Sequence, residues 1–153
     1  MEATSTINYV THITYILFYS CNNYCVRQVI LLFILGLEGM GGILGGILLV
    51  LAPDGHIMKI PVSVMHGAFP DFLIPGLILT GMGLLTTTAC ITVLFRTKLA
   101  WLMSGLALIG FTIWFAVEIA ILRELHIFHI IWGVPILIGY WCALPLFQNN
   151  TKQ

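Results

Sequence analysis

The sequence predicts an all-α integral membrane protein, a four-helix bundle with an N-terminal interfacial segment. Of its 153 residues, 59% are hydrophobic and only 8% are charged, whereas roughly 25% of the residues of a soluble domain are charged. Four apolar stretches each approach or exceed the about 20 residues that a helix needs to cross a bilayer. Short connections separate them, so the length leaves no room for a separate soluble domain.

Residues 1–28 are predicted to form the interfacial segment. Residues 1–24 contain four of the five tyrosines and no lysine or arginine. Tyrosine favours the membrane surface because its ring is apolar and its hydroxyl group seeks water. The missing basic start is unlike a secretory signal peptide, and the apolar part at 13–19 is too short to span. We therefore expect a retained helix that lies on the membrane.

The bundle is predicted to occupy residues 29–147 and to be followed by a polar tail at 148–153. Apolar runs mark the spans, and turn-forming or basic residues separate them. The longest connection runs from Ala52 to Asp71 and contains a short apolar piece at 61–65. The spans are expected at 29–51, 72–95, 99–122 and from about 127 to 147.

Basic residues predict the orientation of the bundle. Four crossings place both termini on one side, together with Arg27, Arg96, Lys98 and Lys152, whereas Lys59 and Arg123 lie opposite. Loops rich in lysine and arginine remain in the cytoplasm, so both termini are predicted to be cytoplasmic. The four cysteines then lie in the reducing half, which predicts free thiols.

Glu38 lies within a glycine-rich part of the first span. Helical geometry places Gly41, Gly42 and Gly45 on the face of Glu38, and glycines spaced four apart, such as Gly42 and Gly46, allow a second helix to approach closely. Glu38 is therefore predicted to face inward, about 14 Å from the start of the span. Two interpretations remain open: a neutral carboxyl bonded to a neighbour such as Thr86, Thr87 or Ser104, and a group that carries a proton or holds a ligand.

A second polar cluster is expected at the opposite end of the spans. Glu118 lies about 6 Å below the end of the third span, and His129 begins a helical stripe on the fourth span. If the two stripes face each other, a carboxyl group meets an imidazole beneath a connection that holds His66 and Asp71. For an enzyme, Glu118 with His129 or His66 would be the acid and base. The alternative is that hydration by loops and headgroups gathers these residues there.

Aromatic residues predict an apolar slot next to this cluster. Phe111, Trp114 and Trp132 are candidates to line a site for a hydrophobic ligand, and Tyr140 continues the stripe on the fourth span. Packing and contact with lipid are the alternative role for the tryptophans. The predicted ligand-binding residues are Glu38, Asp71, Phe111, Trp114, Trp132 and Tyr140.

Composition also argues against several classes of protein. Six basic and six acidic residues provide no basic face for nucleic acid. Metal sites need three or four converging ligands, and His126 with His129 supplies only two. We therefore predict no metal, no cofactor and no nucleic-acid partner.

The run Phe69-Pro70-Asp71-Phe72-Leu73-Ile74-Pro75-Gly76, together with Pro53-Asp54-Gly55 and Trp114-Phe115-Ala116-Val117-Glu118-Ile119, resembles an uncharacterised group of small bacterial four-span membrane proteins. The resemblance covers residues 36–146 and leaves residues 1–28 outside. It implies a four-span fold and a place in the bacterial inner membrane, and it brings no activity with it.

The sequence supports three hypotheses of function. The first is a non-enzymatic membrane protein that binds a hydrophobic or lipid-like small molecule, or a partner subunit, between its helices. The second is a membrane enzyme that acts on a lipid or isoprenoid substrate through Glu118 and a histidine. The third is a proton-coupled transporter that uses Glu38. Membrane lipids are expected partners, and the small-residue seam suggests a homodimer.

Overall fold

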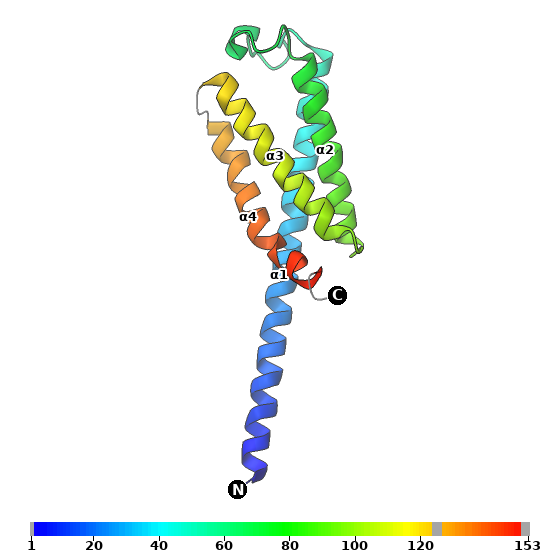
Figure 1. Cartoon of the computed structure of the whole chain (residues 1–153), viewed down its shortest axis with the longest axis vertical. Coiled ribbons are helices and arrows are strands. Elements are labelled where there is room, and N and C mark those ends of the chain that lie inside the picture. Colours follow the sequence, from blue (N-terminus) through cyan, green and yellow to red (C-terminus); the bar gives the residue numbers. More distant parts are fainter. Residues whose placement is uncertain (1, 124–126, 151–153) are drawn as a thin grey trace.

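The protein is an all-helical bundle (Figure 1). The computed structural model describes residues 2–123 and 127–150, with side-chain surroundings for residues 25–123, 127 and 129–148. Consecutive long helices run antiparallel, as short connections between spans require. The elements are α1 (Glu2–Leu51), the short helix η1 (Val62–Met65), α2 (Leu73–Leu94), α3 (Ala100–Leu122) and α4 (Ile127–Asn150).

Four helical segments are long and apolar enough to cross a membrane, so the predicted fold class of a four-span membrane bundle is confirmed. In the described part of the chain these segments are Cys25–Leu51, Leu73–Leu94, Ala100–Leu122 and His129–Gln148. Large apolar side chains cover the outside of the bundle, for example Phe33, which is 69% exposed. In a membrane protein such side chains face lipid rather than water.

The first helix is much longer than its membrane span. α1 continues without a break from Glu2 to Leu51 over 50 residues, which is about 75 Å at 1.5 Å per residue. Its first half extends alone past the other helices (Figure 1). Residues 2–28 are thus helical and continuous with the first span, and their position on the membrane surface stays a prediction.

α1 and α2 pack through glycine, and their contact is the most extensive between helices. A Cβ added at Gly42 would lie 3.0 Å from the Cα of Gly83, and one added at Gly76 would lie 2.9 Å from the backbone oxygen of Gly46. Backbone therefore meets backbone, as small residues permit in membrane helices. We call these four glycines the glycine seam. The seam joins two helices of the same chain, so it is not free to join two copies of the protein. The homodimer therefore stays a prediction, and the glycines no longer support it.

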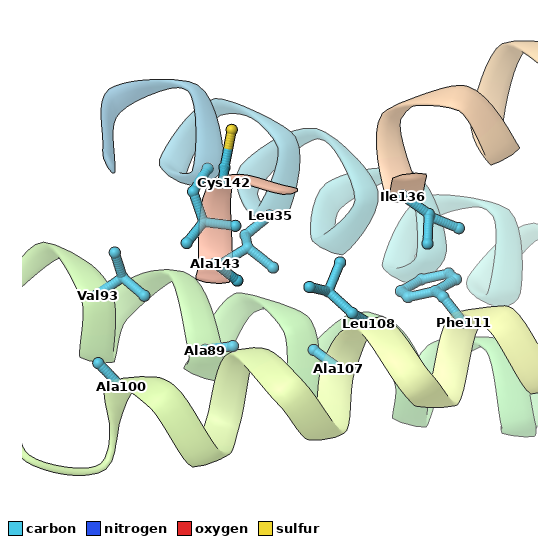
Figure 2. Packing of buried hydrophobic residues seen from close by; sticks show 11 residues of the cluster. Leu35, Ala89, Val93, Ala100, Ala107, Leu108, Phe111, Ile136, Cys142 and Ala143 are labelled. Carbon is cyan, nitrogen blue, oxygen red and sulfur yellow. The ribbon is translucent and has the colours of Figure 1, made fainter. Parts of the chain in front are cut away.

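The larger apolar core lies where all four helices meet. Leu35 of α1, Ala89 of α2, Leu108 of α3 and Ala143 of α4 each have at most 2% of their surface exposed. Figure 2 shows these residues converging, with Phe111 and Ile136 forming the neighbouring part of the same cluster. Small and large side chains alternate, which lets four helices pack closely around one core.

The connection between α1 and α2 covers one end of the bundle. Two glycines with positive φ, Gly55 at 77° and Gly67 at 82°, allow its turns. η1 places Met65 in a second small cluster with Leu49 and Phe72, and this apolar contact holds the connection against the helices. We call this the loop end, and the opposite end, where α2 meets α3, the basic end.

Candidate functional site

Glu38 lies at the midpoint of the span Cys25–Leu51 and is 3% exposed. Its predicted inward orientation agrees with this burial. Its Oε1 atom makes no hydrogen bond to any described residue. A buried carboxyl oxygen without a donor costs free energy, whichever protonation state it has, so this atom needs an explanation beyond packing.

Two of the three neighbours expected to bond Glu38 use their hydroxyl hydrogens elsewhere. Thr86 donates to the backbone oxygen of Met82 at 2.9 Å, and Thr87 donates to that of Gly83 at 2.9 Å. The third, Ser104 of α3, is fully buried, and its Oγ makes no hydrogen bond within the described residues. The core therefore contains two buried side-chain oxygens, on α1 and on α3, to which the described residues give no hydrogen-bond partner.

Trp132 lies one helical turn from Glu38 toward the loop end. A Cβ added at Gly41 would be 2.8 Å from the Cη2 atom of Trp132, so the indole of α4 rests directly on the backbone of α1. Gly41 follows Glu38 by three residues, which is about 4.5 Å along the helix on an adjoining face. Trp132 thus lies at a depth between that of the buried carboxyl group and the loop end.

Glu118 and His129 come together next to this tryptophan. The carboxyl group of Glu118 lies within electrostatic range of the His129 ring. The ring is 8% exposed and meets Phe115 edge to face at 6.0 Å between centroids. The facing sides of α3 and α4 therefore bring one carboxyl group and one imidazole near each other at the loop end.

In the contacts that the structure describes, His66 and Asp71 stabilise the connection between α1 and α2. Nδ1 of exposed His66 is 3.1 Å from the backbone oxygen of Ile121, near the end of α3. Oδ1 of Asp71 accepts a hydrogen bond from the backbone N–H of Leu73 at 3.0 Å, where α2 begins. One contact ties the connection to α3, and the other stabilises the first turn of α2.

The other predicted ligand-binding residues lie along the same helices at different depths. Phe111 is buried, and it packs with Ile136 and Leu108 (Figure 2). Trp114 is half-buried on α3. The hydroxyl group of Tyr140 is 3.1 Å from that of Thr112 and links α4 to α3 on the outside of the bundle. Of this set, Phe111 belongs to the apolar core.

The structure offers little for metal or thiol chemistry in its described part. No three histidine, cysteine or acidic side chains of the described residues gather closely enough to hold a metal ion. His126, the second histidine of the weak metal hypothesis, lies outside the described residues. Cys25, Cys90 and Cys142 are free thiols, as predicted, and Cys21 lies outside the described side chains.

Comparison with protein-family models, curated proteins and solved structures finds no match to this chain. The resemblance to small bacterial four-span proteins stays a prediction.

Three groups on α1, α3 and α4 follow one another in depth from the loop end toward mid-membrane. The pair Glu118 and His129 comes first, Trp132 on Gly41 comes next, and Glu38 with its unbonded oxygen comes last. We call this the inner column. The sequence predicted the polar residues of this set, but it did not predict that Trp132 packs on Gly41. Gly41 was the available indication, because a glycine on an inward face leaves room for a large ring on the opposite helix.

Proposed function

We propose that the protein is a non-enzymatic membrane protein that binds a small hydrophobic, lipid-like molecule in the inner column between α1, α3 and α4. The observation that carries the proposal is the Oε1 atom of Glu38, which is buried at mid-membrane and accepts no hydrogen bond from the described chain. Intramembrane carboxyl groups without a partner are candidate functional sites. The bound molecule supplies the missing donor.

The chemistry of the inner column defines the class of ligand. Glu38 requires a hydrogen-bond donor, such as a hydroxyl, amide or amine group. Phe111 in the core and Trp132 on Gly41 offer apolar surfaces, and Glu118 with His129 offers a polar contact nearer the loop end. A molecule with an apolar body and a donor group fits this order. Trp132 rests on Gly41 between the two polar levels, so entry from the loop end requires the indole to move.

The orientation belongs to the same proposal. Arg27, Arg96 and Lys98 lie at the basic end, and Lys59 and Arg123 lie at the loop end. The larger basic count favours the cytoplasm, so we place the basic end and both termini there, in a bacterial inner membrane. The loop end, from which the ligand enters, then faces the other side.

The proposal is tested by purifying the full chain in mild detergent and identifying co-purifying molecules by mass spectrometry. We expect one species near one equivalent per chain, and we expect Glu38→Leu to lose it. Glu38→Gln keeps an acceptor oxygen without charge. We therefore expect this variant to retain a ligand whose donor group is neutral and to lose a ligand whose donor group is an amine. Thr88→Val is the matched control, because Thr88 is an exposed hydroxyl residue of α2 that bonds only to its own helix at Leu84.

Several results would contradict this function. The absence of a stoichiometric molecule, or equal retention by the wild type and Glu38→Leu, removes the ligand site. Proton flux in proteoliposomes that needs no ligand and stops in Glu38→Gln favours the transporter. Recovery of two chemically related forms of the molecule, one of which accumulates in Glu118→Gln, favours the enzyme. Stoichiometric capture of a membrane protein in place of a small molecule favours the partner subunit.

A further inference from the structure

A pocket lies between α1 and α4 at the basic end, away from the inner column. It holds about 10 Å³ of space, which is about the room that one water-sized group needs. It therefore accepts only a small polar group, such as a phosphate oxygen, of a larger molecule. Its lining residues are Arg27, Gln28 and Leu31 of α1 and Cys142, Pro145 and Leu146 of α4.

Arg27 is held in place at this pocket by an aromatic ring. Its guanidinium carbon lies 3.9 Å from the centre of the Trp141 ring. An arginine on an aromatic face keeps the N–H groups at its edge for other partners. Among the described residues the structure pairs Arg27 with no carboxylate. The side chain is half-buried, so an anion from outside the chain is its natural partner.

Charge at the basic end is one-sided in the described residues. Arg27, Arg96 and Lys98 lie there, whereas the described acidic side chains lie at mid-membrane or toward the loop end: Glu38, Asp54, Asp71 and Glu118. The surface next to the pocket is thus complementary to a negative group. Anionic lipids are attracted to such clusters with about 1 kcal/mol per basic residue near the surface.

The pocket also lies at the depth of lipid headgroups. Arg27 is close to the start of the span Cys25–Leu51, and Pro145 is close to the end of the span His129–Gln148. Leu31, one turn farther toward the membrane interior, also lines the pocket, but it is fully buried and offers no surface to lipid. Gln28 donates to the backbone oxygen of Val93 at 3.3 Å, which holds the first turn of the span against the end of α2.

We propose that the guanidinium group of Arg27 at this pocket binds the phosphate of an anionic phospholipid. Trp141 positions the guanidinium group. A phosphate accepts the N–H bonds that the ring leaves available, and the lipid chains continue into the bilayer. The site is separate from Glu38 and does not depend on the proposed function of the inner column.

The test uses the full chain reconstituted in vesicles of phosphatidylglycerol or of phosphatidylcholine, extracted with detergent and analysed by native mass spectrometry. We expect the wild type to retain one phosphatidylglycerol and no phosphatidylcholine. Because a hydrogen bond to a charged group is worth about 1.5–3 kcal/mol, Arg27→Gln is expected to lower retention about tenfold or more. Trp141→Leu lowers it less, since the guanidinium group stays but loses its support.

Arg96→Gln is the matched control, because Arg96 is an exposed arginine at the same end and does not line the pocket. It should retain phosphatidylglycerol like the wild type. Arg27→Lys, which keeps the charge, should give intermediate retention and remains a test if Arg27→Gln fails to fold. Equal retention of both lipids, equal loss in Arg96→Gln and Arg27→Gln, or displacement of the lipid by millimolar inorganic phosphate would each overturn the assignment.

Discussion

The pair α1 and α2 and the pair α3 and α4 are joined in different ways. In the first pair the backbones meet at the glycine seam, where Gly42 packs on Gly83 and Gly46 on Gly76. In the second pair the contacts are made by long side chains. They are Phe115 with His129, Thr112 with Tyr140, and Trp101 with Phe147.

This difference explains where polar chemistry can lie in so small a bundle. Helices whose backbones touch leave no volume between them, so the glycine seam can position other groups but cannot hold a ligand. Helices separated by aromatic and polar side chains have parts that can rotate. Accordingly, Glu118 and His129 meet between α3 and α4, whereas α1 contributes Glu38 from the face beside its seam.

The largest effect on stability is expected from Gly83→Ala in the glycine seam. A Cβ at this position would lie 2.5 Å from the backbone nitrogen of Ile43 and 2.8 Å from the backbone oxygen of Gly39. Backbone atoms cannot move aside as a side chain can, so the two helices must separate. We expect a loss of about 1–3 kcal/mol in the free energy of unfolding, measured by titration with sodium dodecyl sulfate.

The control for this experiment is Gly81→Ala on the same helix. An added Cβ at Gly81 meets no atom within 4 Å, and alanine favours the helix relative to glycine by about 1 kcal/mol. Gly81→Ala should therefore leave stability unchanged or raise it. Similar losses in both variants would show that the seam does not join α1 and α2.

A smaller effect is expected where α3 and α4 share a hydrogen bond. The Thr112 hydroxyl group donates to the backbone oxygen of Leu108 at 2.8 Å, so in its 3.1 Å contact with Tyr140 the tyrosine is the donor. Tyr140→Phe removes the donor and leaves Thr112 bonded, at a cost of about 0.6 kcal/mol. Thr112→Val removes the acceptor and leaves a hydroxyl group unpaired, at a cost of about 1–2 kcal/mol.

The double variant tests whether Thr112→Val costs more than Tyr140→Phe because it leaves a hydroxyl group unpaired. In Thr112→Val with Tyr140→Phe no unpaired hydroxyl remains, so its stability should exceed that of Thr112→Val alone. Detergent titration of the four proteins provides the cycle. Equal costs for the two single variants, or strict additivity in the double variant, would mean that the hydroxyl contact does not contribute.

Hydropathy was sufficient to predict the spans. The second and third were expected at 72–95 and 99–122 and lie at Leu73–Leu94 and Ala100–Leu122. Each span is bounded by a turn, proline or basic residue, and a helix in lipid must satisfy its backbone internally, so length and composition leave few alternatives. Hydropathy did not predict that α1 is continuous from Glu2, because residues 2–24 are less uniformly apolar than the spans.

Helix neighbours could not be read from spacing alone. The sequence placed Gly41, Gly42 and Gly45 on one face with Glu38, and it predicted a packing seam there. In the structure the face is divided, because Gly42 packs on α2 whereas Gly41 packs on Trp132 of α4. A glycine on an inward face indicates that another helix packs closely there, and only the fold shows which helix it is. For the same reason the contact between Arg27 and Trp141, 114 positions apart, left no local pattern to find.

A small effect on stability is also expected from Gly41→Ala, although Gly41 has as close a neighbour as other glycines of α1. Its added Cβ would lie 2.8 Å from the outer edge of the Trp132 ring, and a ring on rotatable bonds can turn away where the backbone at Gly83 cannot. We expect a loss of less than about 1 kcal/mol in the free energy of unfolding, together with a shift in tryptophan fluorescence that is absent when Trp132→Phe is the background. Because this ring lies at a depth between Glu38 and the loop end, Gly41→Ala should also change the rate of ligand uptake along the proposed route from the loop end. A cost equal to that of Gly83→Ala, without a fluorescence shift, would show that the Trp132 contact is as rigid as the glycine seam and cannot open.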